Sequence, residues 1–221
     1  MPTVQGVVAS AARALLGDTV RVVGASRTDA GVHALRQVAS LATDRTLDTA
    51  SVGRALNASL PPDIRVRAVG EAADGFNARR RATGKRYAYL VDAAFVAAPL
   101  LRRYAWHVPR PLDLDVMRAG LAAILGAHDF SAFCAAAGRG AMPICRVRAV
   151  HVLRRKSRVA IVISADHFLH HMVRNLVGSA LAVGRGAREP GWIAGVLRSR
   201  DRRLAGVTAP AHGLTLVRVL Y

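Results

Sequence analysis

A polar loop near the N-terminus carries the residues best suited to chemistry. The segment 24–34 reads GASRTDAGVHA and follows a short apolar run. A carboxylate such as Asp29, held in a loop by a rigid sheet, can act as a nucleophile, a base or a stabiliser of an electron-poor carbon. The same spacing fits a plain tight turn, in which Asp29 caps the next segment and Gly31 supplies a positive φ. From residue types alone, the plain turn is the commoner outcome.

Three histidines, His167, His170 and His171, form a second group with possible chemistry. Zinc sites normally have more ligands at a clearer spacing, so we expect no metal here. We expect these histidines to hydrogen-bond the polar loop or a phosphate at a helix N-terminus. Cys134 and Cys145 are interpreted as ordinary buried residues, because nothing beside them in the sequence resembles a nucleophile's base.

The charge balance favours a polyanionic partner. The chain has 32 Lys and Arg against 14 Asp and Glu, a formal net charge of +18. A GC-rich coding bias explains arginine in place of lysine, but it does not explain the shortage of acids. Arginine grips phosphate in two places, so nucleic acid is the favoured partner. The densest basic run comprises Arg79, Arg80, Arg81, Lys85 and Arg86, and a second group comprises Arg198, Arg200, Arg202 and Arg203.

Several classes of protein are excluded. No apolar stretch approaches the roughly 20 residues that span a bilayer, and we find no signal peptide. Two cysteines cannot form a disulfide framework, which favours reduced thiols and a cytoplasmic location. Aromatic residues make up only 5% of the chain, too few for a broad platform that stacks single-stranded nucleic acid.

Hydrophobic spacing predicts an α+β protein with a loose internal duplication. We place subdomains at 1–82 and 83–221. Helices are predicted over 7–16, 51–60, 114–125, 169–183 and 191–197, and strands over 19–24, 37–43, 64–69, 85–91, 146–153, 158–164 and 214–220.

The polar loop contains RTDAGVHA, which resembles the signature of the tRNA pseudouridine synthase A family. Further segments resemble the same family in the same order. They read LNASLPPDI over 56–64, FNAR over 76–79, KRY over 85–87, HDFSAF over 128–133, FLHHMVRN over 168–175 and TAPAHGL over 208–214. The resemblance covers nearly the whole chain.

This resemblance implies an isomerase that converts uridine to pseudouridine at positions 38–40 in the anticodon arm of tRNA. It implies Asp29 as the catalytic carboxylate, paired with Arg174, and Tyr87 as the ring that stacks on the uracil. Arg27 and His170 are expected to contact the substrate, and the run from Arg79 to Arg86 to contact RNA. The family needs no cofactor and acts as a homodimer. Whether the carboxylate attacks the sugar, attacks the base or abstracts a proton stays open.

The implied fold is the pseudouridine synthase fold, with two ferredoxin-like halves, joined and mainly antiparallel sheets, and a central cleft. Compared with the family, the chain is expected to lack the first strand of its N-terminal half. Two other functions are considered. One is a catalytically impaired RNA-binding paralogue, and the other is a basic structural or ribosome-associated protein.

Overall fold

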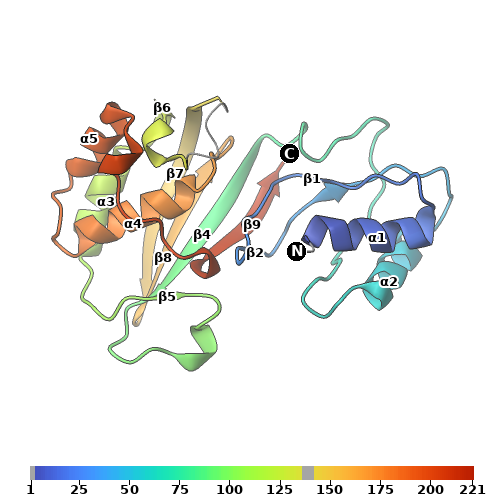
Figure 1. Cartoon of the computed structure of the whole chain (residues 1–221), viewed down its shortest axis with the longest axis horizontal. Coiled ribbons are helices and arrows are strands. Elements are labelled where there is room, and N and C mark those ends of the chain that lie inside the picture. Colours follow the sequence, from blue (N-terminus) through green and yellow to red (C-terminus); the bar gives the residue numbers. More distant parts are fainter. Residues whose placement is uncertain (1–2, 136–141) are drawn as a thin grey trace. The chain divides into compact units, whose positions relative to one another are not determined.

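The computed structural model describes residues 3–135 and 142–221, which fall into two compact units (Figure 1). Unit 1 contains the described residues up to Arg27 together with Gln37–Ala82. Unit 2 contains Thr28–Arg36 and the described residues from Thr83 to Tyr221. The subdomain boundary after residue 82 stays a prediction. The segment Thr28–Arg36 lies in unit 2 because its strand pairs with the sheet there.

Unit 1 consists of two helices and a two-stranded antiparallel ribbon. The helices are α1 (Val4–Leu16) and α2 (Thr49–Ser59), and the strands are β1 (Val23–Gly24) and β3 (Ala39–Ser40). Both predicted helices are confirmed, whereas the two strands are much shorter than predicted. Side chains of α1 and α2 pack together around a common apolar core, which contains Ala9, Ala12, Leu16, Val20, Val22, Val52, Leu56 and Leu60.

Local sequence signals explain where α2 begins and ends. The Asp48 carboxylate accepts a hydrogen bond from the main-chain N–H of Ser51 at 2.8 Å, which satisfies one free donor of the first turn. The helix ends at Ser59, just before Pro61 and Pro62, as the prolines predict.

The strand predicted over 64–69 is wrong. This segment has no strand pairing in the structure. The side chain of Asn57 takes the place of a neighbouring strand, because its Oδ1 accepts from the N–H of Val66 and its Nδ2 donates to the carbonyl of Val66, both at 2.8 Å. A single amide side chain therefore satisfies the peptide groups of Val66 that an extended neighbour would otherwise pair.

Unit 2 is built on one mixed sheet, in the order β2-β9-β4-β8-β7-β6, with β5 beside β4. The β2–β9 and β4–β5 pairs are parallel and the other pairs are antiparallel. Its strands are β2 (His33–Ala34), β4 (Gly84–Asp92), β5 (Trp106–His107), β6 (Gly126–Asp129), β7 (Ile144–Arg155), β8 (Arg158–Ala165) and β9 (Leu214–Leu220). The expected α+β class with a mostly antiparallel sheet is confirmed. The division into two ferredoxin-like halves stays a prediction.

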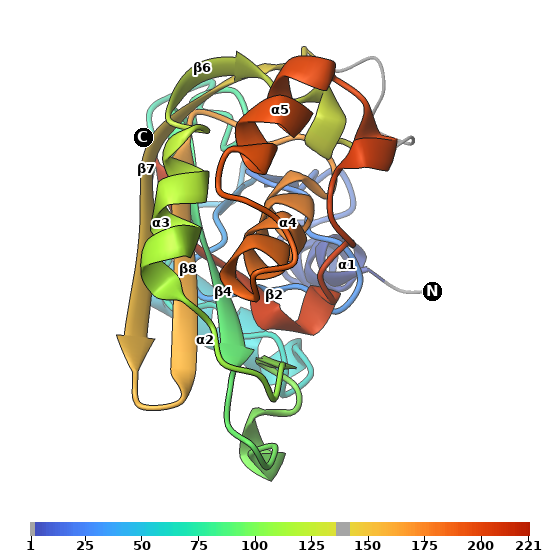
Figure 2. The same cartoon turned by 90° about the vertical axis from the view of Figure 1, so that its left-hand side faces the viewer.

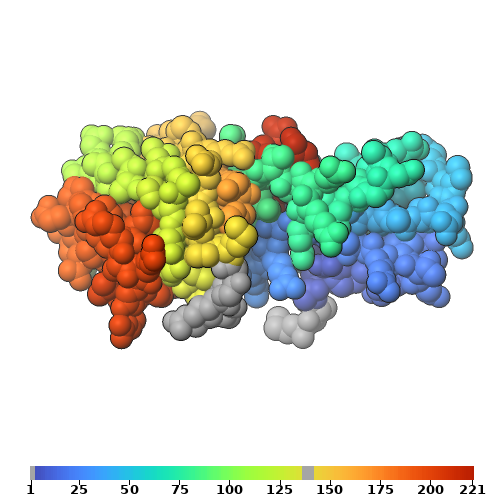
Figure 3. Space-filling view, turned by 90° about the horizontal axis from the view of Figure 1, so that it is seen from above, coloured from blue at the N-terminus to red at the C-terminus, as the bar shows by residue number. Residues whose placement is uncertain are grey.

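Three α-helices of unit 2 cover one face of this sheet (Figure 2). They are α3 (Leu114–Ala122), α4 (Met172–Gly184) and α5 (Trp192–Ser199). The short 3-10 turns are η1 (Pro99–Leu101), η2 (Ser131–Phe133), η4 (Arg202–Leu204) and η5 (Ala211–Gly213). Figure 3 shows the side chains of α5, in orange-red, next to those of α3, in light green. Among the described residues, no helix combines the length and apolar character needed to cross a bilayer.

Strand β4 alternates between the two faces of the sheet, as its sequence predicts. Tyr87, Tyr89 and Val91 are all buried. The hydroxyl of Tyr89 donates to the carbonyl of Pro210 at 2.8 Å, and burial raises the pKa of that hydroxyl. The prediction that Tyr89 is a core residue is confirmed.

Candidate active site

Asp29 lies in a tight turn that leads into β2 of unit 2. The main-chain N–H of Val32 donates to the carbonyl of Asp29 at 3.0 Å, and Gly31 has a φ of +83°. The turn expected from the sequence is therefore present. However, the Asp29 carboxylate meets donors from α4 and from the segment before it. The tight turn is therefore compatible with a chemical role for this carboxylate.

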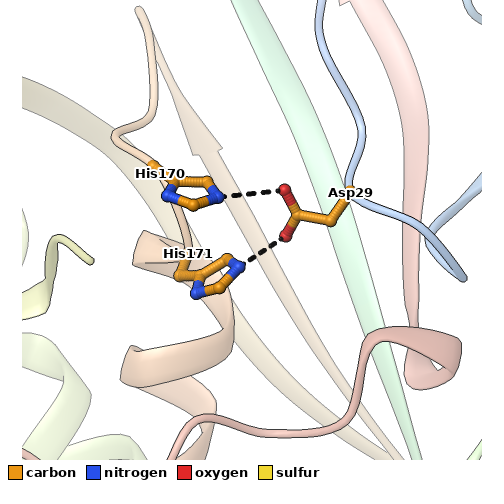
Figure 4. A group of neighbouring side chains, drawn as sticks. All are labelled: Asp29, His170 and His171. Atoms are coloured by element: carbon orange, nitrogen blue, oxygen red, sulfur yellow. Dashed lines mark ion pairs between the residues drawn. The ribbon is translucent and has the colours of Figure 1, made fainter. Parts of the chain in front are cut away.

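The start of α4 aims two consecutive histidines at this carboxylate. The helix begins at Met172, later than predicted, and His171 before it has a left-handed φ of +63°. Successive side chains of an α-helix diverge by about 100°. Because His170 and His171 precede the helix, their rings instead lie side by side, with centroids 3.9 Å apart, and both face Asp29 (Figure 4).

The Asp29 carboxylate has three nitrogen neighbours. Arg174 NH1 donates to Oδ2 at 3.0 Å, His171 Nε2 lies 3.1 Å from Oδ2, and His170 Nε2 lies 3.4 Å from Oδ1. The Asp29 side chain is 30% exposed, whereas that of Arg174 is only 14% exposed. The structure thus brings together three residues that the sequence selected, Asp29, Arg174 and His170. Solvent still reaches the carboxylate.

The expectation that the three histidines contact the polar loop is confirmed for His170 and His171, whereas His167 lies against Asp166 and Cys145 instead. Burial of His171 lowers its pKa; Asp29 opposes that effect, while Arg174 and His170 reinforce it. Burial therefore favours the neutral imidazole, whereas the guanidinium of Arg174 supplies a positive charge 3.0 Å from Asp29. The FLHHMVRN segment carried the only signal, but nothing in it showed which histidine would lie closer.

Within the described residues, Asp29, His170 and His171 form the one group of His, Cys, Asp or Glu side chains that could meet at a metal ion. Their ligand atoms lie within 4.8 Å of one another. Arg174 already occupies the same carboxylate, and a guanidinium 3.0 Å away repels a second cation. The arrangement fits a carboxylate held by hydrogen-bond donors better than a metal centre.

Tyr87 is held in place by its own chain. The residue is 6% exposed, and its ring meets the ring of Phe168 edge-to-face, with centroids 5.2 Å apart. Phe168 belongs to the segment that leads from β8 to α4, two residues before His170. The structure therefore fixes the tyrosine ring through the same segment that carries the histidines.

The remaining predicted binding residues divide between the units. Arg27, Arg79, Arg80 and Arg81 are exposed in unit 1. In unit 2, Lys85 and Arg86 lie on β4. Arg86 is exposed, and its Nε donates to Ser164 Oγ at 3.0 Å. These positions fit a positively charged surface for RNA, and they identify no individual contact with a nucleotide.

Cys145 has an unexpected neighbour. No base stands beside the cysteines in the sequence, but the fold brings one to Cys145: His167 Nε2 lies 3.3 Å from Cys145 Sγ, and Asp166 lies 3.1 Å from the other ring nitrogen. The thiol is nevertheless fully buried, and burial raises its pKa to about 12. A neutral, inaccessible thiol is no nucleophile, so the interpretation of Cys145 as a structural residue holds.

Comparison with known proteins supports the resemblance. Residues 1–79 and 121–221 match a family model described as tRNA pseudouridine synthase. A protein of Myxococcus xanthus called tRNA pseudouridine synthase A is 43% identical over 221 residues, 100% of this chain and 83% of that protein. Proteins of the same name are 44% identical in Chloroflexus aurantiacus, over 99% of this chain and 80% of the relative, and 38% identical in a Thermoanaerobacter species, over 99% and 90%. This chain belongs to the tRNA pseudouridine synthase family.

Proposed function

We propose that this protein isomerises uridine to pseudouridine in tRNA, with Asp29 as its catalytic carboxylate. The observation that carries the proposal is the partly exposed Asp29 carboxylate, fixed by the Arg174 guanidinium at 3.0 Å in a chain of this family. A substrate can reach this carboxylate, because the Asp29 side chain is 30% exposed.

The reaction can be balanced without a cofactor. The bond between N1 of uracil and C1′ of ribose breaks, and a bond between C5 and C1′ forms. The proton on C5 leaves, and N1 gains one. No electrons are transferred to or from an outside group, so the proposed reaction needs no redox partner.

Each residue of the site has a role in this scheme. The carboxylate of Asp29 either attacks C1′, attacks the base or removes a proton. Arg174 pairs with its negative charge and fixes its direction. Tyr87 supports a uracil that has left the base stack, since an aromatic ring is the usual partner of such a base. His170 and Arg27 contact the substrate.

The anticodon arm, at positions 38–40, is the proposed target. The basic run from Arg79 to Arg86 supplies phosphate contacts, which favour binding of RNA without selecting a sequence. A homodimer, a cytoplasmic location, and two ferredoxin-like halves with a cleft between them belong to the same proposal. Their support is the family membership.

The test is pseudouridine formation on an unmodified tRNA transcript with uridines at 38–40. Chemical labelling followed by reverse-transcription stops reports each modified position. A matched transcript with cytidine at these positions is the control. Stops confined to 38–40 would support the proposal, and stops elsewhere would refute the assigned target. Binding of tRNA without any product would favour an RNA-binding paralogue, and binding without preference for tRNA would favour a basic structural protein.

A further inference from the structure

The direction of the Arg174 side chain depends on one main-chain carbonyl. Its Nε donates to the carbonyl of Ala209 at 2.7 Å, while its NH1 donates to Asp29. The N–H of Ala209 in turn donates to the carbonyl of Arg174 at 3.2 Å. Because the guanidinium is planar, the direction of the Nε–H bond also fixes the plane in which NH1 lies. The position of Ala209 therefore decides how Arg174 meets the carboxylate.

Ala209 belongs to a segment, residues 205–210, that has no helix or strand. Such a segment needs side-chain contacts to fix its position. Thr208, directly before Ala209, donates from its hydroxyl to Asn175 Oδ1 at 2.7 Å. Asn175 is the neighbour of Arg174 on α4, so this bond ties the segment that holds the acceptor carbonyl of Ala209 to the same turn of helix that carries the arginine.

Arg202 completes the arrangement. Its NH2 donates to Asn175 Oδ1 and to Thr208 Oγ1, both at 2.9 Å. The Asn175 side chain is fully buried, and its Nδ2 donates to the carbonyl of Phe133 at 2.6 Å. Burial also lowers the pKa of the Arg202 guanidinium. The sequence grouped Arg202 with three other arginines as a second basic run, and the structure shows that its guanidinium bonds inward to Asn175 and Thr208.

We propose that these three side chains, Thr208, Asn175 and Arg202, are positioning residues for catalysis. We call them the Thr208 network. They hold the carbonyl of Ala209 where it orients Arg174. The inference rests on the proposed function, because it concerns the residue that aligns the catalytic carboxylate. A network that only stabilised the fold would lower stability without selectively slowing the chemical step.

The test compares Thr208→Val with Thr208→Ser. Valine keeps the shape of threonine but removes the hydroxyl that both donates to Asn175 and accepts from Arg202. We expect Thr208→Val to lower kcat by about 10- to 100-fold, because a small misplacement of an aligned group costs rates of that order. We expect KM for tRNA to change by less than about twofold. Serine restores the hydroxyl, so Thr208→Ser should recover most of the activity.

Ser164→Ala on β8 is the matched control, because it removes another buried hydroxyl that is bonded to an arginine, in this case Arg86 of β4. An equal fall of kcat in Ser164→Ala, or an unchanged kcat in Thr208→Val, would overturn the inference. If Thr208→Val does not fold, Arg202→Met carries the same test, since it removes a donor at the edge of the network.

A measurement independent of activity separates this inference from the proposed function. The Nε–H resonance of Arg174 is identified by its loss in Arg174→Lys. Hydrogen exchange at that group should become faster in Thr208→Val and stay unchanged in Ser164→Ala. Unchanged exchange in both variants would overturn the positioning role. An enzyme that makes no pseudouridine, but shows the exchange difference, would overturn the proposed function alone.

Discussion

Arg174 gives the sharpest prediction, because its two hydrogen bonds lie on the path to the catalytic carboxylate. Arg174→Met keeps the apolar stem and removes both the bond to Asp29 at 3.0 Å and the bond to Ala209 at 2.7 Å. A charge-assisted hydrogen bond contributes about 1.5–3 kcal/mol. Removal of one partner of a fully buried ion pair costs about 3–5 kcal/mol. Since Asp29 is 30% exposed, water compensates part of this cost. We therefore expect Arg174→Met to lose about 2–3 kcal/mol of transition-state stabilisation at the carboxylate.

This loss corresponds to a fall of about 30- to 150-fold in the rate of the chemical step. Arg174→Lys should fall between Arg174→Met and the wild type, because an ammonium keeps the charge but cannot reproduce the planar donor pair. The assay is single-turnover release of tritium from C5-labelled uridine in tRNA, which reports the proton lost from C5. Arg118→Met is the control, since it removes an exposed ion pair with Asp115 elsewhere in unit 2. A rate for Arg174→Met within threefold of the wild type would refute the reasoning.

Three further predictions concern stability. Asn57→Ala should lower the free energy of unfolding, measured in urea, by about 2 kcal/mol, because the two hydrogen bonds from its side chain to the main chain of Val66 are lost; a loss below about 0.5 kcal/mol would show that another group replaces them. Gly178→Ala should cost about 1–3 kcal/mol, because its Cβ would collide with the carbonyl of Val207, whereas Gly195→Ala on α5 meets open space and should not destabilise. The lowered pKa of His171 means that the folded state binds fewer protons than the unfolded state, so stability should fall as pH drops below the ordinary value of 6.5. His171→Asn, which tolerates the left-handed backbone, should reduce this acid loss in thermal unfolding between pH 7.5 and 5, and an unchanged pH dependence would contradict the role assigned to the imidazole.

Regular elements were the most predictable part of the fold. Apolar spacing and the two prolines located α2, and strict alternation located β4 with its buried tyrosines. The strand predicted over 64–69 failed because pattern alone cannot show that a side chain, Asn57, occupies the pairing position. Tertiary contacts override a local preference in that case.

The site was predictable only in part. Asp29 and Arg174 are 145 positions apart, and no periodicity connects them; the family resemblance did. The role of His171 depends on one left-handed residue at the start of α4, a backbone state that its sequence does not signal. Arg202 was grouped by sequence with the basic residues around it, and only the structure shows that its guanidinium bonds inward to the buried amide of Asn175.

The central claim is that Asp29 performs the isomerisation. Its most direct test is a comparison of wild type with Asp29→Asn on the same tRNA transcript, by single-turnover tritium release and by tRNA binding. Asparagine keeps the size of the side chain and removes its charge. We expect Asp29→Asn to bind tRNA with affinity close to wild type and to release no tritium above background. Tritium release by Asp29→Asn at the wild-type rate would contradict the account, because the reaction would then need no carboxylate at this position.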